Sequence, residues 1–164
     1  MKTIEIRGDN RRTSPSKIRE ASRGIILCED QILLSYAHSK DLWMIPGGGM
    51  EKPESREECC IRELAEETGY IVRPIRHFLT IDEYYNEWLY RSYYYTCEPV
   101  DKIEPNLTKA ENCIGLETRW VPLKKALEIF SKHQNHIGKD EIKYGSYLRE
   151  YSALLELGTI IIHS

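Results

Sequence analysis

The sequence predicts an α/β fold in which a mixed β-sheet lies between helices on both faces. Strand-like segments precede one strong helix, a long and mostly antiparallel pair of strands fills the middle, and the last third has helical periodicity. The length of 164 residues suits one domain with a proper core. We therefore expect a single domain over residues 1–164.

The first part of the chain contains short segments typical of strands. Residues 3–7 (TIEIR) precede a polar turn, and residues 18–30 and 31–39 are expected to pair through a Glu-Asp hairpin turn. Residues 42–47 (LWMIPG) form a further apolar run that ends at proline and glycine. These segments supply the predicted start of the sheet.

Residues 55–68 are predicted to form the strongest helix of the chain. Ser55 and Glu58 have the spacing of a capping box, in which each side chain binds the other residue's backbone N–H. Gly69 stands where such a helix stops.

Strands and then helices are expected in the rest of the chain. Aromatic and β-branched residues favour strands over residues 70–85, 87–100 and 116–123. Helices are predicted over about 122–157, with Gly158 as the stop. The apolar tail 159–164 is expected to add an edge strand or to contact a second subunit, which would support a homodimer.

Composition and charge bear on the partners and the cellular compartment expected for the chain. With 23 basic and 26 acidic residues the net charge is −3, which argues against a nucleic-acid partner. Five cysteines without C-x-x-C spacing favour reduced thiols over a disulfide framework. The sequence has no apolar run of membrane-spanning length and no signal-peptide core near its start, so we expect a cytoplasmic protein without a membrane partner.

The predicted helix 55–68 carries Glu63, Glu66 and Glu67 in a wedge about 100° wide. Like charges at this spacing repel by roughly 0.2–0.5 kcal/mol per pair, so the arrangement needs a reason. A solvated acidic face is the simpler interpretation. The face opposite the carboxylates carries apolar and small residues, which are Ile61, Leu64, Ala65 and Thr68.

Three features favour a metal site over a solvated face. Three consecutive glycines, residues 47–49, precede the helix and allow the backbone to approach a ligand closely. Arg62 stands beside the carboxylates, where it could pair with Glu54 or orient Glu63. An oxygen-rich cluster also suits Mg²⁺, which would turn the repulsion into ligation.

Residues 48–70 resemble the Nudix box, Gly-x5-Glu-x7-Arg-Glu-U-x-Glu-Glu-x-Gly-U, where U is hydrophobic. Gly48 begins the motif, Glu54 follows at the required distance, and RELAEETGY over residues 62–70 completes it. Seven fixed identities would coincide by chance about once in 10⁸ starting points. Tyr70 replaces the commoner aliphatic residue. Flanking segments extend the resemblance over most of residues 18–130.

The resemblance implies an enzyme of the α/β/α Nudix type that uses Mg²⁺ or Mn²⁺ to hydrolyse a nucleoside diphosphate linked to another group. By similarity, three box carboxylates would bind the metal with help from the Gly48 carbonyl. Glu63 or Glu66 would act as the base. Arg62 and Glu54 would hold the carboxylates in place. The metal-binding carboxylates implied are Glu63, Glu66 and Glu67.

Further site residues are expected outside the box. Members of the family often use one more carboxylate, for which Glu117 is our candidate, with Glu111 and Glu104 as rivals. Arg19 and Arg23 lie on the strand predicted to run beside the site, and arginine suits bidentate binding of phosphate. All of these residues could also be ordinary surface residues.

Aromatic residues near the box are candidates for stacking on a base, and we single out Trp43 and Tyr85. Tyr85 lies sixteen residues past Gly69, where related dinucleoside polyphosphate hydrolases often have a tyrosine. The proline that accompanies ADP-ribose hydrolases is missing between Pro74 and Pro99. A small nucleotide such as a dinucleoside polyphosphate or a nucleoside triphosphate is therefore favoured.

Three other functions remain open for the same fold. The chain could be a catalytically silent nucleotide sensor, but such proteins tend to lose box carboxylates, and all are present here. It could be an isomerase acting on a prenyl diphosphate, against which the intact box also argues. Removal of pyrophosphate from RNA 5′ ends is disfavoured by the acidic charge.

Overall fold

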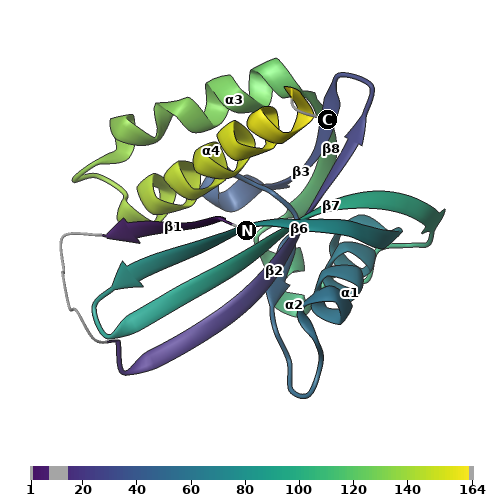
Figure 1. Ribbon diagram of the computed structural model, residues 1–164, viewed down its shortest axis with the longest axis horizontal. Helices are drawn as coiled ribbons and strands as arrows, with labels where there is room; N and C mark the ends of the chain where they lie inside the picture. Colours follow the sequence, from purple (N-terminus) through teal and green to yellow (C-terminus); the bar gives the residue numbers. More distant parts are fainter. Residues whose placement is uncertain (1, 8–14, 163–164) are drawn as a thin grey trace.

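A mixed β-sheet forms the centre of the computed structural model, which describes residues 2–7 and 15–162 (Figure 1). The strands are β1 (Lys2–Arg7), β2 (Lys17–Cys28), β3 (Gln31–Ala37), β4 (Leu42–Met44), β5 (Gly47–Gly49), β6 (Tyr70–Tyr85), β7 (Trp88–Lys102) and β8 (Leu116–Pro122). The α-helices are α1 (Arg56–Thr68), α2 (Lys109–Cys113), α3 (Leu123–Ser131) and α4 (Glu141–Ile162), and 3₁₀ turns cover His38–Lys40 and Lys132–His136.

Strand pairing gives the sheet its mixed character. The main strand order is β1-β6-β7-β2-β3-β4, with β5 beside β2 and β8 beside β3. β6 and β7 form the long antiparallel pair predicted for the middle of the chain, whereas β1 pairs with β6 and β2 with β7 in parallel. The pairing of β5 with β2 places the three glycines next to residues 21–23.

Helices cover both faces of the sheet, which confirms the predicted α/β/α arrangement. In Figure 1, α3 and α4 lie on one side of the strands, and α1 and α2 lie on the other. The larger core packs between the sheet and the pair α3–α4, with Ile25, Ile81 and Phe130 among its buried members. The smaller core includes Ile26 and Leu64. Burying apolar surface on both faces stabilises the layered fold.

Helix α1 begins and ends as the sequence predicts. Ser55 accepts a hydrogen bond from the Glu58 N–H, and the Glu58 carboxylate accepts one from the Ser55 N–H, so the capping box is complete. Gly69 ends the helix with φ of 75°, a left-handed conformation that glycine adopts without steric cost.

The end of the chain differs from the prediction, because α4 does not stop at Gly158 but continues to Ile162. The expected edge strand in the apolar tail is therefore wrong for residues 159–162, and residues 163–164 lie outside the described part of the chain. Leu154 and Leu157 are buried, and Ile160 continues this apolar stripe onto the core. Packing of the stripe outweighs the low helix propensity of one glycine. Neither α4 nor another helix in the described ranges is long and apolar enough to cross a membrane.

The two glycines of α4 provide a matched test of this packing. A methyl group at Gly158 would meet open space, whereas one at Gly145 would lie 2.1 Å from the hydroxyl oxygen of Tyr85. We expect Gly158→Ala to raise the free energy of unfolding by about 0.5–1 kcal/mol, since alanine favours helix. Gly145→Ala should give no such gain, because Tyr85 must move. Urea denaturation of both variants measures the difference, and equal gains would contradict the contact.

Candidate active site

The glycine loop and α1 meet so closely that a side chain at residue 48 would not fit. Gly47 has φ of 143°, and a methyl group there would lie 2.1 Å from the Ser22 carbonyl oxygen. A methyl group at Gly48 would lie 2.3 Å from Oε2 of Glu63. Glycine therefore permits the backbone of β5 to lie directly against the Glu63 carboxylate.

Glu63 and Glu67 lie one helical turn apart and are both buried, at 8% and 9% exposure. The predicted alternative of a solvated acidic face is therefore wrong for these two residues. The Glu67 carboxylate accepts hydrogen bonds from the Ser35 hydroxyl at 3.1 Å and the Gly47 N–H at 3.2 Å. Burial raises the pKa of Glu67 to about 8, although the nearby positive charge of Arg23 acts to lower it. Burial also raises the pKa of Glu63.

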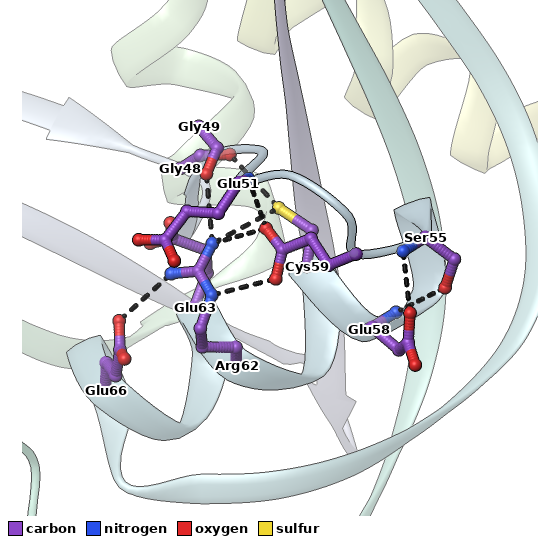
Figure 2. A network of polar contacts seen from close by, with 10 residues as sticks. Gly48, Gly49, Glu51, Ser55, Glu58, Cys59, Arg62, Glu63 and Glu66 are labelled. Atoms are coloured by element: carbon purple, nitrogen blue, oxygen red, sulfur yellow. Dashed lines mark hydrogen bonds and ion pairs between the residues drawn. The ribbon is translucent and has the colours of Figure 1, made fainter.

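Arg62 links the helix to the loop before it (Figure 2). Its Nε and Nη2 donate to the two carboxylate oxygens of Glu54 at 2.9 and 2.6 Å, and Nη2 also donates to the Gly49 carbonyl at 3.0 Å. Its Nη1 donates to Glu63 at 2.8 Å and to Glu66 at 3.2 Å. The guanidinium thus fixes Glu63 and compensates charge repulsion along the helix.

A third carboxylate, Glu111, reaches the same place from α2. Residues 103–108 approach the end of α1, where the Asn106 N–H donates to the Glu66 carbonyl at 2.8 Å. Thr108 and Glu111 form a second capping box, which uses Oε2 of Glu111 at 2.7 Å from the Thr108 N–H. One oxygen each from Glu63, Glu67 and Glu111 lies within 4.8 Å of the others. An all-oxygen set of three carboxylates fits Mg²⁺ or Mn²⁺.

These carboxylates open onto a cavity of about 1560 Å³ between the sheet, the glycine loop and the first turns of α4. Arg19, Arg23 and Tyr85, named from the sequence as candidates for substrate binding, also line it. Arg23 Nη1 donates to the Ile45 carbonyl at 2.8 Å, and its buried Nε has no hydrogen-bond partner among the described residues. The cavity therefore places the guanidinium groups of Arg19 and Arg23, two of the four arginines in its lining, in the same space as the carboxylate cluster.

Two other residues predicted for the site, Glu66 and Trp43, do not line the cavity. Glu66 is 36% exposed at its side chain, binds Arg62 and does not line the cavity. Trp43 on β4 packs against Tyr36, with ring centroids 4.5 Å apart, and also lies outside the cavity lining. Trp43 is therefore not near the carboxylate cluster, whereas Glu66 shares the Nη1 group of Arg62 with Glu63 and its predicted role as a metal ligand stays a prediction.

Glu117 is likewise separate from the cluster that it was expected to complete. It lies on β8 opposite Tyr36 of β3, where it forms an ion pair with Arg119 and lies 3.1 Å from Nε2 of His38. Hydrogen bonding to His38, followed by Arg119, lowers the pKa of Glu117. Glu111, the rival in the sequence, is the carboxylate from outside α1 that lies near Glu63 and Glu67.

A buried ionic network at the α4 side of the cavity was not predicted. Arg149 of α4 binds Glu83 at 3.0 Å and Glu150 at 2.8 Å, and its Nε donates to the Tyr94 hydroxyl at 3.1 Å. The Tyr94 hydroxyl in turn donates to Glu150 at 2.9 Å. The sequence contained a signal for this network, because Glu150 interrupts an apolar stripe of helical spacing. The apolar members of that stripe are Tyr147, Leu154 and Leu157.

Comparison with known proteins agrees with this geometry. The family model of the NUDIX domain matches residues 18–142, which is more than half of the chain. The chain belongs to the Nudix family.

Curated Nudix relatives act on different compounds. The chain is 32% identical over 121 residues to CMP-5'-(N-acetyl-N-hydroxy-3-aminopropyl)phosphonate hydrolase of Streptomyces rubellomurinus, a match that covers 68% of this chain and 56% of that protein. It is 27% identical over 107 residues to diphosphoinositol polyphosphate phosphohydrolase 3-alpha of Mus musculus, covering 65% and 63%. The chain thus spans less than two thirds of the length of either relative.

Solved Nudix structures share the fold. A NUDIX hydrolase from Nitrosomonas europaea matches with a TM-score of 0.54 and 19% identity, over 82% of this chain and 88% of that one. The MutT protein from Methanosarcina mazei Go1 has a TM-score of 0.54 and 21% identity, over 72% and 85%. Both comparisons support the α/β/α architecture.

The ion pair between Glu54 and Arg62 predicts a pH-dependent stability. Hydrogen bonding to Arg62 lowers the pKa of Glu54 from 4.5 to about 2. Because the folded-state pKa is depressed, the stabilisation is complete above pH 4.5 and is lost as the pH falls towards 2. We expect Glu54→Gln to lower the melting temperature near neutral pH, and the difference from the wild type to shrink below pH 4.5.

Glu104→Gln is the control for the Glu54 variant, since it removes an exposed carboxylate outside the Arg62 cluster. Its melting temperature should follow that of the wild type. A difference for Glu54→Gln that stays constant from pH 7 to pH 3 would show that the charge on Glu54 contributes nothing.

Proposed function

We propose that the chain is a hydrolase that cleaves the diphosphate of a nucleoside diphosphate linked to another group, with Mg²⁺ or Mn²⁺ bound at the carboxylate cluster. The observation that supports this most is the convergence of Glu63, Glu67 and Glu111 within 4.8 Å at one wall of the cavity. A bound divalent cation supplies charge neutralisation for the phosphoryl oxygens and a lowered pKa for water.

The neighbouring residues prepare these carboxylates for that role. Arg62 and Glu54 hold Glu63 beside Gly48, while Ser35 and the Gly47 N–H orient Glu67. Glu63 is our candidate for the general base, because it faces the cavity, whereas Glu66 does not line it. A base must lie within hydrogen-bond reach of the water that it activates.

Arg19 and Arg23 are our candidates for binding the phosphates. Among the described residues no ion pair is found for Arg19, and its guanidinium lies next to Gly49, 3.3 Å from where a methyl group would stand. Nη1 of Arg23 lies 3.8 Å from the Glu150 carboxylate. Arg23 keeps its Nε without a partner among the described residues. Guanidinium groups bind phosphate oxygens through charge-assisted hydrogen bonds.

The substrate proposed is a small molecule, with Tyr85 near its base or sugar. Tyr85 lines the cavity, and its buried hydroxyl has no hydrogen-bond partner in the described residues. A dinucleoside polyphosphate or a nucleoside triphosphate would contain the required diphosphate. The names of the curated relatives point to different substrates, so they favour no particular nucleotide.

A paired substitution tests the metal site. We expect Glu111→Gln to lower kcat/KM by at least about tenfold and to weaken Mn²⁺ binding, because it removes a charged oxygen ligand. Glu117→Gln is the matched control and should leave both unchanged, since Glu117 lies on β8, outside the cluster of Glu63, Glu67 and Glu111. Activity is measured as phosphate products from dinucleoside polyphosphates, nucleotide sugars, ADP-ribose and nucleoside triphosphates, and metal binding by calorimetry.

The opposite pattern would replace our choice of ligand. If Glu117→Gln abolished activity and Glu111→Gln did not, the outside ligand would be Glu117, as the sequence alone suggested. If the wild type bound nucleotide but hydrolysed no member of the panel with either metal, the chain would be a nucleotide sensor.

A further inference from the structure

Tyr90 lies at the end of the cavity that is farther from the metal-binding carboxylates. It is on β7 opposite Arg19 of β2, whereas Arg23 of β2, near the glycine loop, is opposite Tyr94. Four residues of strand separate the two pairs, which corresponds to about 13 Å. The Tyr90 side chain is half-buried and lines the cavity. The space between the carboxylates and this ring is therefore long enough for a diphosphate and a sugar.

One face of the Tyr90 ring looks onto a space above small side chains. Trp88 stacks on the ring from one side along β7, with centroids 5.7 Å apart and an interplanar angle of 19°. Tyr85 of β6 meets it at 60°, so the two rings do not stack. Ser92 follows Tyr90 on the same face of β7, is paired with Ala21 of β2, and both line the cavity. The side of the ring away from Trp88 therefore borders a space that has a floor of small residues.

The first turns of α4 form the wall across from this floor. Ile142, Gly145, Ser146 and Arg149 follow the spacing i, i+3, i+4 and i+7, so they share one face of the helix, and all four line the cavity. Gly145 and Ser146 are small, and Ile142 is 77% exposed although it lines the cavity. A flat apolar group bound there would remove the isoleucine from water. We call the space lined by Ala21, Tyr90, Ser92, Ile142 and Ser146 the outer slot.

The neighbouring arginines leave the outer slot to a flat group. The Arg19 guanidinium lies next to Gly49, 3.3 Å from where a methyl group would stand, so it turns back towards the glycine loop. Arg149 is held by Glu83 at 3.0 Å and by Glu150 at 2.8 Å. A tyrosine ring beside small residues is a platform on which any nucleobase can stack, because every base has a π-face.

We propose that Tyr90 is a specificity-determining residue, which stacks on the nucleobase of the substrate in the outer slot while Ile142 covers the base from α4. The proposal rests on the hydrolase function proposed above and deepens it, because it assigns a place to the nucleoside. The chain then favours diphosphates that carry a base over diphosphates that carry none.

The test compares two probes that share a diphosphonate and differ in the nucleoside. These are α,β-methylene-ADP and methylenediphosphonate, and neither can be cleaved between its two phosphorus atoms by hydrolysis of an anhydride. Dissociation constants are measured by calorimetry at saturating Mg²⁺. For the wild type we expect α,β-methylene-ADP to bind at least about fivefold more tightly, as stacking of one base on one aromatic ring requires.

Substitutions of Tyr90 separate stacking from a structural role. Tyr90→Ala should weaken α,β-methylene-ADP by at least about fivefold and leave methylenediphosphonate unchanged, whereas Tyr90→Phe keeps the ring and should bind both probes as the wild type does. Tyr84→Ala is the matched control. Tyr84 neighbours Tyr85 on β6 but points to the other face of the sheet, where the Arg7 guanidinium lies 4.3 Å from its ring. It should leave both constants unchanged.

A second variant does not depend on the folding of Tyr90→Ala. Ile142 is an exposed residue in the first turn of α4, so Ile142→Ala should fold as the wild type does, which melting temperatures check. We expect it to weaken α,β-methylene-ADP by at least about twofold and to leave methylenediphosphonate unchanged, because apolar surface covered by the base is lost.

Equal affinity of the wild type for the two probes would overturn the proposal, and so would equal weakening of both probes by Tyr90→Ala or by Ile142→Ala. The diphosphate site itself would stand in those cases. If neither probe bound the wild type, the diphosphate site and the proposal would both be contradicted. A chain that binds α,β-methylene-ADP through Tyr90 but hydrolyses no substrate would keep the outer slot and lose only the hydrolase function.

Discussion

The structure depends on holding two buried carboxylates one helical turn apart. Glu63 and Glu67 repel each other, and burial penalises the charge of each. Arg62 compensates on one side, and the Ser35 hydroxyl with the Gly47 N–H compensates on the other. A divalent cation bound there, as proposed above, would neutralise the remaining unfavourable charge.

Much of the surrounding fold serves to place these two side chains. The glycine strand β5 is fixed beside β2, which allows the backbone at Gly48 to lie against Glu63. On the opposite side of the cavity, α4 is anchored by the buried network of Arg149, Glu83 and Glu150. Removing one partner of such a network leaves an uncompensated buried charge, which typically costs about 3–5 kcal/mol. The network therefore gives α4 a defined position above the sheet.

Local sequence patterns predicted the parts of the site that are close in sequence. The capping box of α1, the glycine loop and the relation of Arg62 to Glu54 and Glu63 follow from spacings of fewer than fifteen residues. The layered α/β/α architecture also followed, because strand and helix patterns are distinct along most of the chain.

Features that depend on contacts between distant segments were not predictable in this way. Glu111 was only a rival to Glu117, since its position depends on how residues 103–108 pack along α1. Trp43 was a reasonable stacking residue until the pairing of β4 with β3 placed it against Tyr36. Gly158 was predicted to end the helix because helix propensity does not take account of the packing of the apolar stripe that continues to Ile160.

The central claim is that Glu63, Glu67 and Glu111 form one divalent-cation site, and anomalous X-ray scattering from crystals grown with Mn²⁺ tests it most directly. We expect an anomalous peak about 2.0–2.2 Å from a carboxylate oxygen of each residue, the range of small divalent cations with oxygen ligands. Saturating Mn²⁺ that leaves these three carboxylates without a peak, and binds instead at exposed acids such as Glu117 and Glu128, would contradict the claim.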